Sequence, residues 1–441
     1  MKPIDLWYSA RLRVDAALGN LERAGAELAG TIDWQDWQPG RRTVLCLRRS
    51  TFVKDVDQMR LRGTFNWAKV SAAKVRKYQE RWVPPEYRIQ TYFYNFLETS
   101  LRRDKELLAR FAIGFLGAVM KTHPIDAVLA GNTDYWQDEV IKIACRHFGI
   151  PFLALPRENY SMEIDEINVG KRFVESKFRY NGDGVAVFCE ATQRTMIRSG
   201  SFPENGVWIT GAPRIDHWIG VKLLPIEQRR TIVLLNYCHG YLADENFIDV
   251  ANLFIAAAKA SDGDAVFVLK SKKKNEEEVA RREIPGFNEA PIEFLCEEPI
   301  HVTYPRCRAV IGVNSLASVE GFLAEMAVIV PNWSDARRIP EECLLLRDDP
   351  DDIAVTYFAD SPDELADFLK RAAAHQLPPK GTPEMRRKRF CKHIELPDEG
   401  TCSDRVHAFI GHYIDRAEAR RRPRDVRAAG GLEVAGSKQG V

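Results

Sequence analysis

The sequence predicts two α/β domains, each built on a parallel β-sheet with helices on both faces. Short apolar, β-branched runs recur along the chain, stretches with helical periodicity separate them, and polar residues or glycine follow most of the runs. Strands that alternate with helices are typical of doubly wound parallel sheets. The alternation lapses once, in the charged connector over residues 222–230, so we expect two successive domains.

The length of the chain agrees with this division. With 441 residues, two or three domains are expected, each large enough to bury its own core. We place an N-terminal α/β domain at 1–221, a C-terminal α/β domain at 222–400, a terminal helix at 401–415 and a disordered basic tail at 416–441. The tail holds few groups that could join a core, and its arginines alternate with Asp and Glu. Two interpretations of these arginines stay open, a solvated helix end or a contact with anionic lipid.

The first domain begins with an amphipathic helix, expected over 5–30. Strands follow over 43–47, 127–130, 152–155, 185–188 and 207–210. Helices are expected over 86–121, 135–148 and 190–199. The segment 54–83 is basic and aromatic, and no strand is assigned to it.

The second domain repeats the alternation. Strands are expected over 231–235, 265–269, 292–295, 309–313 and 327–330, and a further apolar run follows at 344–346. Helices are expected over 248–260, 364–374 and 404–416, and a charged loop over 275–290. The tetrad Ser361-Pro362-Asp363-Glu364 places Ser at the N-cap, Pro at the first helical position and Glu at the third, so a helix should begin there.

The segment 309–331 shows the features of a ligand site most clearly. It is predicted to form a strand, a polar turn, a helix and a second strand. Helical geometry turns Glu320 toward the apolar face, where its carboxylate needs a donor. Asn314 and Ser315 lie where free N–H groups and the helix dipole favour an anion such as phosphate. A nucleotide would fit, with phosphates at the helix start and ribose at Glu320; alternatively, Asn314 or Ser315 only caps the helix and an Arg or Lys pairs with Glu320.

Further polar residues follow the other predicted strands. Ligands of such sheets bind outside the carboxyl ends of the strands, so these residues should gather at one rim, in a cleft between the domains. The residues are Asn132, Arg157, Glu158, Thr210, Arg214, Asp216, Asn236, His239, Lys270, Asn314 and Ser315.

Three of these positions suggest particular chemistry. Arg157 and Glu158 are adjacent at a strand end and cannot both enter the core, so Glu158 is a candidate general base and Arg157 an anion clamp. A salt bridge between neighbouring elements is the alternative for this pair. Lys270 follows a buried strand and could reach a phosphate, although the run Lys270 to Lys274 also fits a solvated charge cluster. His239 is a further candidate acid or base.

Several classes of protein are excluded or disfavoured. The chain has no G-x-G-x-x-G after its first strand, no P-loop and no G-x-S-x-G, and its formal net charge of +1 gives no footprint for nucleic acid. Two D-x-D triplets, at 262–264 and 349–351, lie outside strand ends and are interpreted as chance. We expect no metal and no cofactor, because helix N-termini and Lys270 can neutralise phosphates.

The nine cysteines lack zinc spacing, and no signal peptide or apolar run of 18 residues occurs, which predicts a cytoplasmic protein.

A resemblance to a known group sharpens these expectations. The run VWITGAPRID at 207–216, GIPF at 149–152 leading to LPRE at 155–158, and the unit at 314–331 resemble GT-B glycosyltransferases of bacterial surface-polysaccharide synthesis. The nearest likeness is to capsule-type Kdo transferases and CDP-glycerol glycerophosphotransferases, over about residues 125–400. The resemblance implies a donor nucleotide in the C-terminal domain, with Lys270, Ser315 and Glu320 at matching positions, and acceptor chemistry in the N-terminal domain.

The leading hypothesis is therefore a nucleotide-sugar-dependent glycosyltransferase that acts on a surface polysaccharide, glycan or lipid-linked acceptor. Glu158 or Asp216 would be base or nucleophile, and Arg157 and Arg214 would bind anionic groups. His239, Asn132 and Thr210 complete the candidate site. The alternatives are a sugar-nucleotide isomerase of the UDP-GlcNAc 2-epimerase type and a non-catalytic binding protein of the same fold. Peripheral contact with the inner membrane face through the basic tail is a further expectation.

Overall fold

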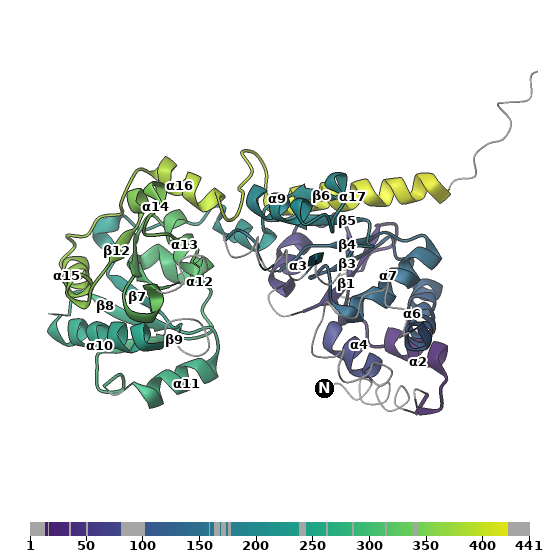
Figure 1. Ribbon diagram of the computed structural model, residues 1–441, viewed down its shortest axis with the longest axis horizontal. Coiled ribbons are helices and arrows are strands. Elements are labelled where there is room, and N and C mark those ends of the chain that lie inside the picture. The colour runs from purple at the N-terminus through teal and green to yellow at the C-terminus, as the bar shows by residue number, and fades with distance from the viewer. Residues whose placement is uncertain are drawn as a thin grey trace, which may run out of the picture.

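The computed structural model contains two parallel six-stranded sheets, one in each half of the chain (Figure 1). It describes residues 14–421, except 16, 35–36, 50–51, 81–101, 158, 163–167, 169–172, 175–177, 238–243, 262, 285, 314 and 338–342. The predicted disordered tail beyond 421, the first part of the helix expected over 5–30, and residues 86–101 of the second helix lie outside the described residues.

The N-terminal sheet has the strand order β2-β1-β3-β4-β5-β6, and every pair is parallel. Its strands are β1 (Thr43–Arg48), β2 (Asn66–Ser71), β3 (Ala127–Ala130), β4 (Phe152–Ala154), β5 (Gly184–Val187) and β6 (Val207–Ile209). The five predicted strands are confirmed. The sequence did not reveal β2, because Lys69 interrupts its apolar pattern; in the fold Lys69 is buried and its Nζ lies 2.7 Å from Asp57 Oδ1.

The C-terminal sheet has the order β12-β11-β10-β7-β8-β9, again entirely parallel. Its strands are β7 (Thr231–Leu235), β8 (Val266–Lys270), β9 (Ile292–Leu295), β10 (Cys307–Ile311), β11 (Ala327–Pro331) and β12 (Tyr357–Ala359). The apolar run at 344–346 is not a strand. Leu344 and Leu345 pack into the core instead, and the edge of the sheet is formed by the very short β12.

Helices cover both faces of the N-terminal sheet. They are α2 (Leu21–Ala29), α3 (Phe52–Arg60), α4 (Ala72–Gln79), α6 (Arg102–Thr122), α7 (Trp136–Phe148) and α9 (Glu190–Arg198). Successive residues of a strand point to opposite faces, so Val44 and Cys46 enter one apolar cluster while Leu45 and Leu47 enter another. Burial of β1 on both faces explains why it appears in the sequence as a continuous apolar run.

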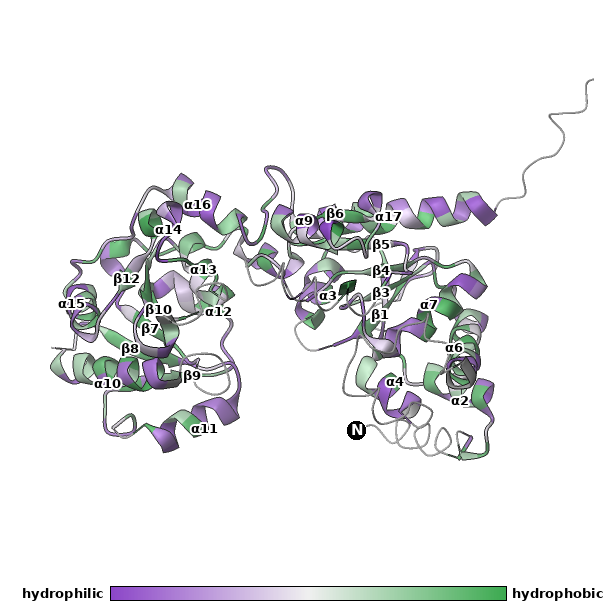
Figure 2. Cartoon of the chain, in the orientation of Figure 1, coloured by the Kyte–Doolittle hydropathy of each residue, from purple (hydrophilic) through white to green (hydrophobic). Residues whose placement is uncertain are grey.

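The C-terminal sheet is covered in the same way. Its helices are α10 (Asp244–Ala260), α11 (Lys274–Glu283), α12 (Ile300–Thr303), α13 (Leu316–Leu323), α14 (Pro350–Val355), α15 (Pro362–Ala373) and α16 (Pro383–Cys391). The start of α15 is confirmed, because the Ser361 side chain accepts from the backbone N–H of Glu364. The loop expected over 275–290 is wrong: α11 forms there, with the Glu276 carboxylate accepting from the backbone N–H groups of Lys272 and Lys273. The helix buries only Ala280, so its sequence lacks an apolar stripe. In Figure 2 most of α11 is hydrophilic, whereas the strands are hydrophobic.

The chain passes between the two sheets twice. The first passage lies between β6 and β7 and contains the short helix η3 (Pro213–Trp218); the second follows α16 and leads to α17 (Cys402–Arg421). Helix α17 lies along the N-terminal domain (Figure 1) and packs on α3, η3, β3 and β5. It continues six residues beyond the expected end at 415, and Arg421 donates to the carbonyl of Gly149 there. The last helix therefore fastens the end of the chain to the first domain.

Helices α2 and α6 approach each other through glycine. A Cβ atom on Gly25 would lie 2.2 Å from the carbonyl oxygen of Phe111 and 2.6 Å from the backbone N of Phe115. Gly25→Ala should therefore lower the free energy of unfolding by about 2–3 kcal/mol through overpacking, despite the higher helix propensity of Ala. Urea denaturation measures this change.

The matched control is Gly411→Ala in α17, where nothing lies within 4 Å of the added carbon. That variant should be neutral or more stable by up to about 1 kcal/mol. Equal stability of the two variants would show that α2 and α6 do not pack this closely.

Candidate functional site

The turn from β10 to α13 forms the centre of the candidate site. All five residues of β10 are buried, and the chain then passes so close to its neighbours that a Cβ on Gly312 would lie 2.8 Å from Ser318 Oγ. Ser315 is the N-cap of α13, and its Oγ accepts from the backbone N–H of Ala317 at 3.2 Å. The capping interpretation therefore holds for Ser315. Capping uses one N–H of the first turn and leaves the positive end of the helix in place.

A small cavity lies against this helix start. Its volume is about 10 Å³, and its lining includes Gly312, Ser315, Ser318 and Leu344. The Ser318 side chain is only 2% exposed, and its hydroxyl has no hydrogen-bond partner among the residues described. A space of this size holds about one oxygen atom of a water or ligand. The start of α13 therefore offers a hydroxyl in addition to its backbone N–H groups.

Lys270 supplies positive charge at the same edge of the sheet, two strands away from β10. It is the last residue of β8, is 9% exposed, and donates to the carbonyl oxygens of Ser271 (3.2 Å) and Cys296 (2.9 Å). Burial lowers the pKa of Lys270, and the charge of Lys54 lowers it further. Lys54 belongs to α3 of the other domain, so cations of both domains approach each other here. Within the described ranges no carboxylate forms an ion pair with Lys270, an arrangement that suits an anionic ligand.

Glu320 points inward, as its helical position predicted. Its Oε2 accepts from Trp218 Nε1 at 2.9 Å and lies 3.8 Å from His217 Nε2. The partners come from η3 in the linker and are not the Arg or Lys of the alternative interpretation. The ring of His217 also lies 3.9 Å from that of His301, centroid to centroid, and burial together with His217 lowers the pKa of His301. Glu320 thus fastens the linker to α13.

Two residues predicted to act on the substrate have structural partners. Arg214 forms a two-point ion pair with Asp55, at 2.9 and 2.6 Å, and Asp55 is fully buried. Both carboxylate oxygens of Asp216 accept from backbone N–H groups of Cys402 and Ser403 at the start of α17. The geometry therefore gives both side chains a role in holding α3, η3 and α17 together.

The remaining N-terminal candidates are Asn132, Arg157 and Thr210, and the first two follow the ends of β3 and β4. Arg157 donates to the hydroxyl of Tyr135 at 2.9 Å, and the guanidinium of Arg49 lies 4.6 Å from the centre of the same ring. Asn132 is buried, and its Nδ2 has no partner in the part of the chain described. Thr210 lies farther along the sheet, where its hydroxyl bonds to the carbonyl of Gly211 at 3.0 Å. The structure thus brings Arg157 toward Arg49 and Tyr135 but leaves Thr210 outside this group.

Three predicted site residues, Glu158, His239 and Asn314, lie outside the described residues. The structure adds others that the sequence did not indicate: Lys54, His217, Trp218, His301 and Ser318. His217 and Trp218 directly follow the segment 207–216, which was the available signal. Their contact with α13 joins positions 102 residues apart, and no periodicity reports such a pairing.

The described residues show neither a metal-binding cluster nor a membrane-spanning helix. In the described ranges no group of three or more His, Cys, Asp and Glu side chains is placed to hold a metal ion. Asp349, from the second D-x-D triplet, caps α14 by accepting from the backbone N–H of Asp351 at 2.9 Å. No helix in the described part of the chain is long and apolar enough to span a bilayer.

The protein combines two parallel six-stranded sheets with a last helix, α17, that returns to the first domain. The fold is GT-B-like. No protein-family profile matches the sequence, and no curated protein matches it.

Solved structures show distant similarity. A Staphylococcus aureus MnaA–UDP complex matches with 14% identity and a TM-score of 0.47, over 85% of this chain and 97% of that one. The UDP-GlcNAc 2-epimerase of Neisseria meningitidis, bound to UDP-GlcNAc, matches with 13% identity and a TM-score of 0.47, over 84% and 100%. An α,α-trehalose-phosphate synthase of Burkholderia vietnamiensis matches with 11% identity and a TM-score of 0.46, over 86% and 99%. Both transferases and isomerases occur among these proteins, and similarity at this level assigns no activity.

Proposed function

We propose that this protein is a glycosyltransferase that binds a nucleotide-activated sugar at the start of α13 and transfers the sugar to a glycan or lipid-linked acceptor. The observation that carries the proposal is that a helix N-terminus, the Ser318 hydroxyl and the buried cation Lys270 lie at the carboxyl edge of one parallel sheet, after β10 and at the end of β8, with β7 between them. Donors of this kind suit the oxygens of a diphosphate or phosphate. The capsule-type acceptor specificity stays a prediction from the resemblance.

In this proposal the donor half of the site acts through charge. Phosphate oxygens accept from the first-turn N–H groups of α13 and from Lys270, and a ribose hydroxyl replaces the indole N–H of Trp218 at Glu320. When the bond between the sugar and the phosphate breaks, negative charge increases on the leaving nucleotide. Lys270 and Lys54 stabilise that charge because they are already in position.

The acceptor half is assigned to the other sheet. Arg157 and Asn132 lie at strand ends there, and Glu158 follows Arg157 directly. In the proposed step the acceptor hydroxyl gives its proton to Glu158 while its oxygen forms the new bond to the sugar. No metal or cofactor takes part in the proposed step.

Incubation with a panel of nucleotide sugars tests this function. The nucleotide class is first found by a thermal-shift screen with CMP, CDP, UDP and GDP. A transferase should release free nucleotide only when an acceptor glycan is present. Conversion of the donor without any acceptor would instead establish an isomerase, and the absence of a shift with every nucleotide would favour a non-catalytic protein.

Two lysine variants test whether Lys270 belongs to the donor site. Lys270→Met should weaken nucleotide binding about 10- to 100-fold, because a charge-assisted hydrogen bond contributes about 1.5–3 kcal/mol. Lys272→Met, at an exposed position two residues farther on, should change it less than twofold. Calorimetric titration measures both dissociation constants. Equal affinities of the two variants would remove Lys270 from the site.

A further inference from the structure

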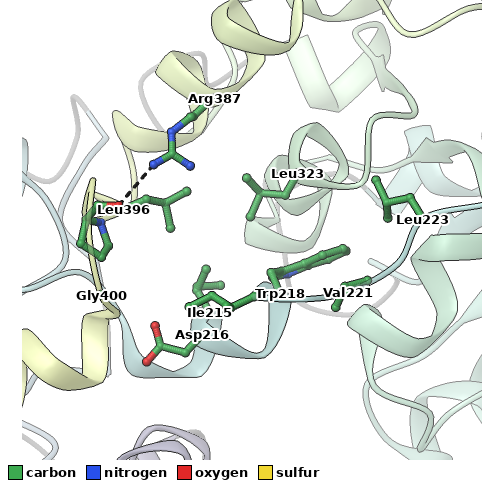
Figure 3. Close-up of a pocket in the computed structure, with 11 residues that line it drawn as sticks. Ile215, Asp216, Trp218, Val221, Leu223, Leu323, Arg387, Leu396 and Gly400 are labelled. Atoms are coloured by element: carbon green, nitrogen blue, oxygen red, sulfur yellow. Dashed lines mark hydrogen bonds between the residues drawn. The ribbon is translucent and has the colours of Figure 1, made fainter.

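A second cavity, separate from the start of α13, lies where the chain passes between the domains. It has a volume of about 270 Å³. Both passages line it: Trp218 and Leu223 from the first, and Leu396 and Gly400 from the second (Figure 3). A ligand here would contact both connections between the domains at once.

Most residues that line this hinge cavity are apolar, although polar atoms contribute nearly half of its surface. The side chains of Trp218 and Leu323 lie on opposite sides of the space in Figure 3. Ile219 at its edge is 61% exposed, although burial of such a side chain would be favourable. Apolar side chains combined with a few polar groups are typical of a site that binds a small ligand with an apolar body and a polar end.

One exposed cation without an ion-pair partner among the described residues, Arg387, borders the hinge cavity. Arg387 reaches toward it from α16, and its only hydrogen bond in the described chain is a long one, 3.4 Å, to the carbonyl of Pro397. No carboxylate in that part of the protein pairs with Arg387. Asp216 also borders the cavity; both of its oxygens accept from backbone N–H groups at the start of α17, and the positive end of that helix offsets part of its negative charge. A ligand with an apolar body and one anionic group would therefore complement this cavity.

The hinge cavity shares two structural elements with the proposed donor site. The ring of Trp218 forms part of its wall, while the N–H of the same ring is bonded to Glu320. Leu323 follows Glu320 by three residues on α13, so both lie on neighbouring parts of one helix face. A molecule pressed against the Trp218 ring would keep that ring on Glu320.

We propose that the hinge cavity binds a small effector with an apolar body and one anionic group, and that its occupation weakens nucleotide binding. The effector holds Trp218 against Glu320, so the ribose can no longer take the place of the indole N–H. Binding of the effector follows from the cavity alone, whereas its effect on the nucleotide rests on the proposed function.

Octanoate, octyl phosphate and 1-octanol serve as probes with the full-length protein. In thermal shift without nucleotide, octanoate or octyl phosphate should stabilise the protein, and the neutral alcohol should do so at least about tenfold less effectively, because it lacks the charge for Arg387. Comparison of the two anions shows whether a carboxylate or a phosphate monoester is preferred. Saturating amounts of the better anion should then raise the dissociation constant for UDP by about fivefold.

Three variants decide the assignment. Arg387→Gln should weaken binding of the anions about tenfold and leave 1-octanol unchanged. Leu323→Trp should weaken binding of all three probes, because the larger side chain occupies part of the cavity. Lys388→Gln, at the adjacent and 80% exposed position, is the matched control and should leave the probe affinities unchanged. Equal effects of the alcohol and the anions, or unaltered binding in both Arg387→Gln and Leu323→Trp, would overturn the proposal. If the unmodified protein binds none of the four nucleotides CMP, CDP, UDP and GDP, that result counts against the proposed function and leaves the probe result standing.

Discussion

Replacing Arg214 by methionine is expected to lower the free energy of unfolding by about 3–5 kcal/mol, since removal of one partner from a buried ion pair leaves the other charge uncompensated. The partner is Asp55, which is fully buried and accepts from both Nε and Nη2 of Arg214 as well as from its backbone N–H. Methionine keeps much of the side-chain volume, so the decrease in the free energy of unfolding measures the effect of removing the charge. Urea denaturation gives the difference.

The control is Arg194→Met, which removes a 49% exposed guanidinium that lies 3.6 Å from Glu190 within one helix. Its expected effect is within about 0.5 kcal/mol. The double variant Arg214→Met/Asp55→Leu should recover part of the lost stability, because no buried charge then remains. If Arg214→Met folds with unchanged stability and loses only substrate binding, the substrate role predicted from the sequence is correct and the structural role is not.

Acid is expected to destabilise the protein by roughly 5 kcal/mol between pH 6 and pH 4, through two buried histidines. Burial is the main cause that lowers the pKa of His393 to about 3 and that of His407 to about 4. In the unfolded chain both titrate near 6.5. Between these values the unfolded state binds a proton at each histidine and the folded state does not, so stability is present above pH 6.5 and decreases as the pH falls.

Each histidine accounts for about 1.4 kcal/mol per pH unit in this window. His393→Gln should therefore remove about half of the histidine-dependent slope, measured by urea denaturation at several pH values. His147→Gln changes an exposed histidine and should leave the slope as it is. Identical slopes for the two variants would show that His393 is not buried in its neutral form.

His393 also connects the two domains. Its Nδ1 lies 2.9 Å from Ser161 Oγ, and its carbonyl accepts from Asn159 at 2.7 Å, so the second passage of the chain is fastened to the N-terminal domain at this point. Protonation of the ring therefore acts on the junction that also borders the hinge cavity. We expect acid to loosen the contact between the domains before the two sheets unfold.

The sequence determined the architecture because most strands are buried on both faces. Such strands appear in the sequence as continuous apolar runs, as at β1, β7 and β10. The start of helix α15 could also be predicted, since all residues of its N-cap lie within four positions of the sequence. Strand β2 and helix α11 were missed because Lys69 is neutralised by Asp57 only in the fold, and because α11 buries little more than Ala280.

The candidate site was determined in part by the same local rules. Helical geometry alone placed Glu320 inward, which holds in the structure. The alternative that Asn314 or Ser315 caps the helix holds for Ser315. The sequence also identified Lys270 as the residue at a buried strand end. The sequence could not identify the hydrogen-bond and ion-pair partners of these residues that lie far away along the chain.

Only the tertiary structure decided those partners. Glu320 meets Trp218 of the linker, Arg214 meets Asp55, and Asp216 caps a helix that begins 186 residues later. Each contact depends on how two separate elements pack, which local propensity and periodicity do not encode. Burial without a partner is costly for a charged group, so the packing that supplies the partner also determines whether a strand-end residue holds the fold together or faces a ligand.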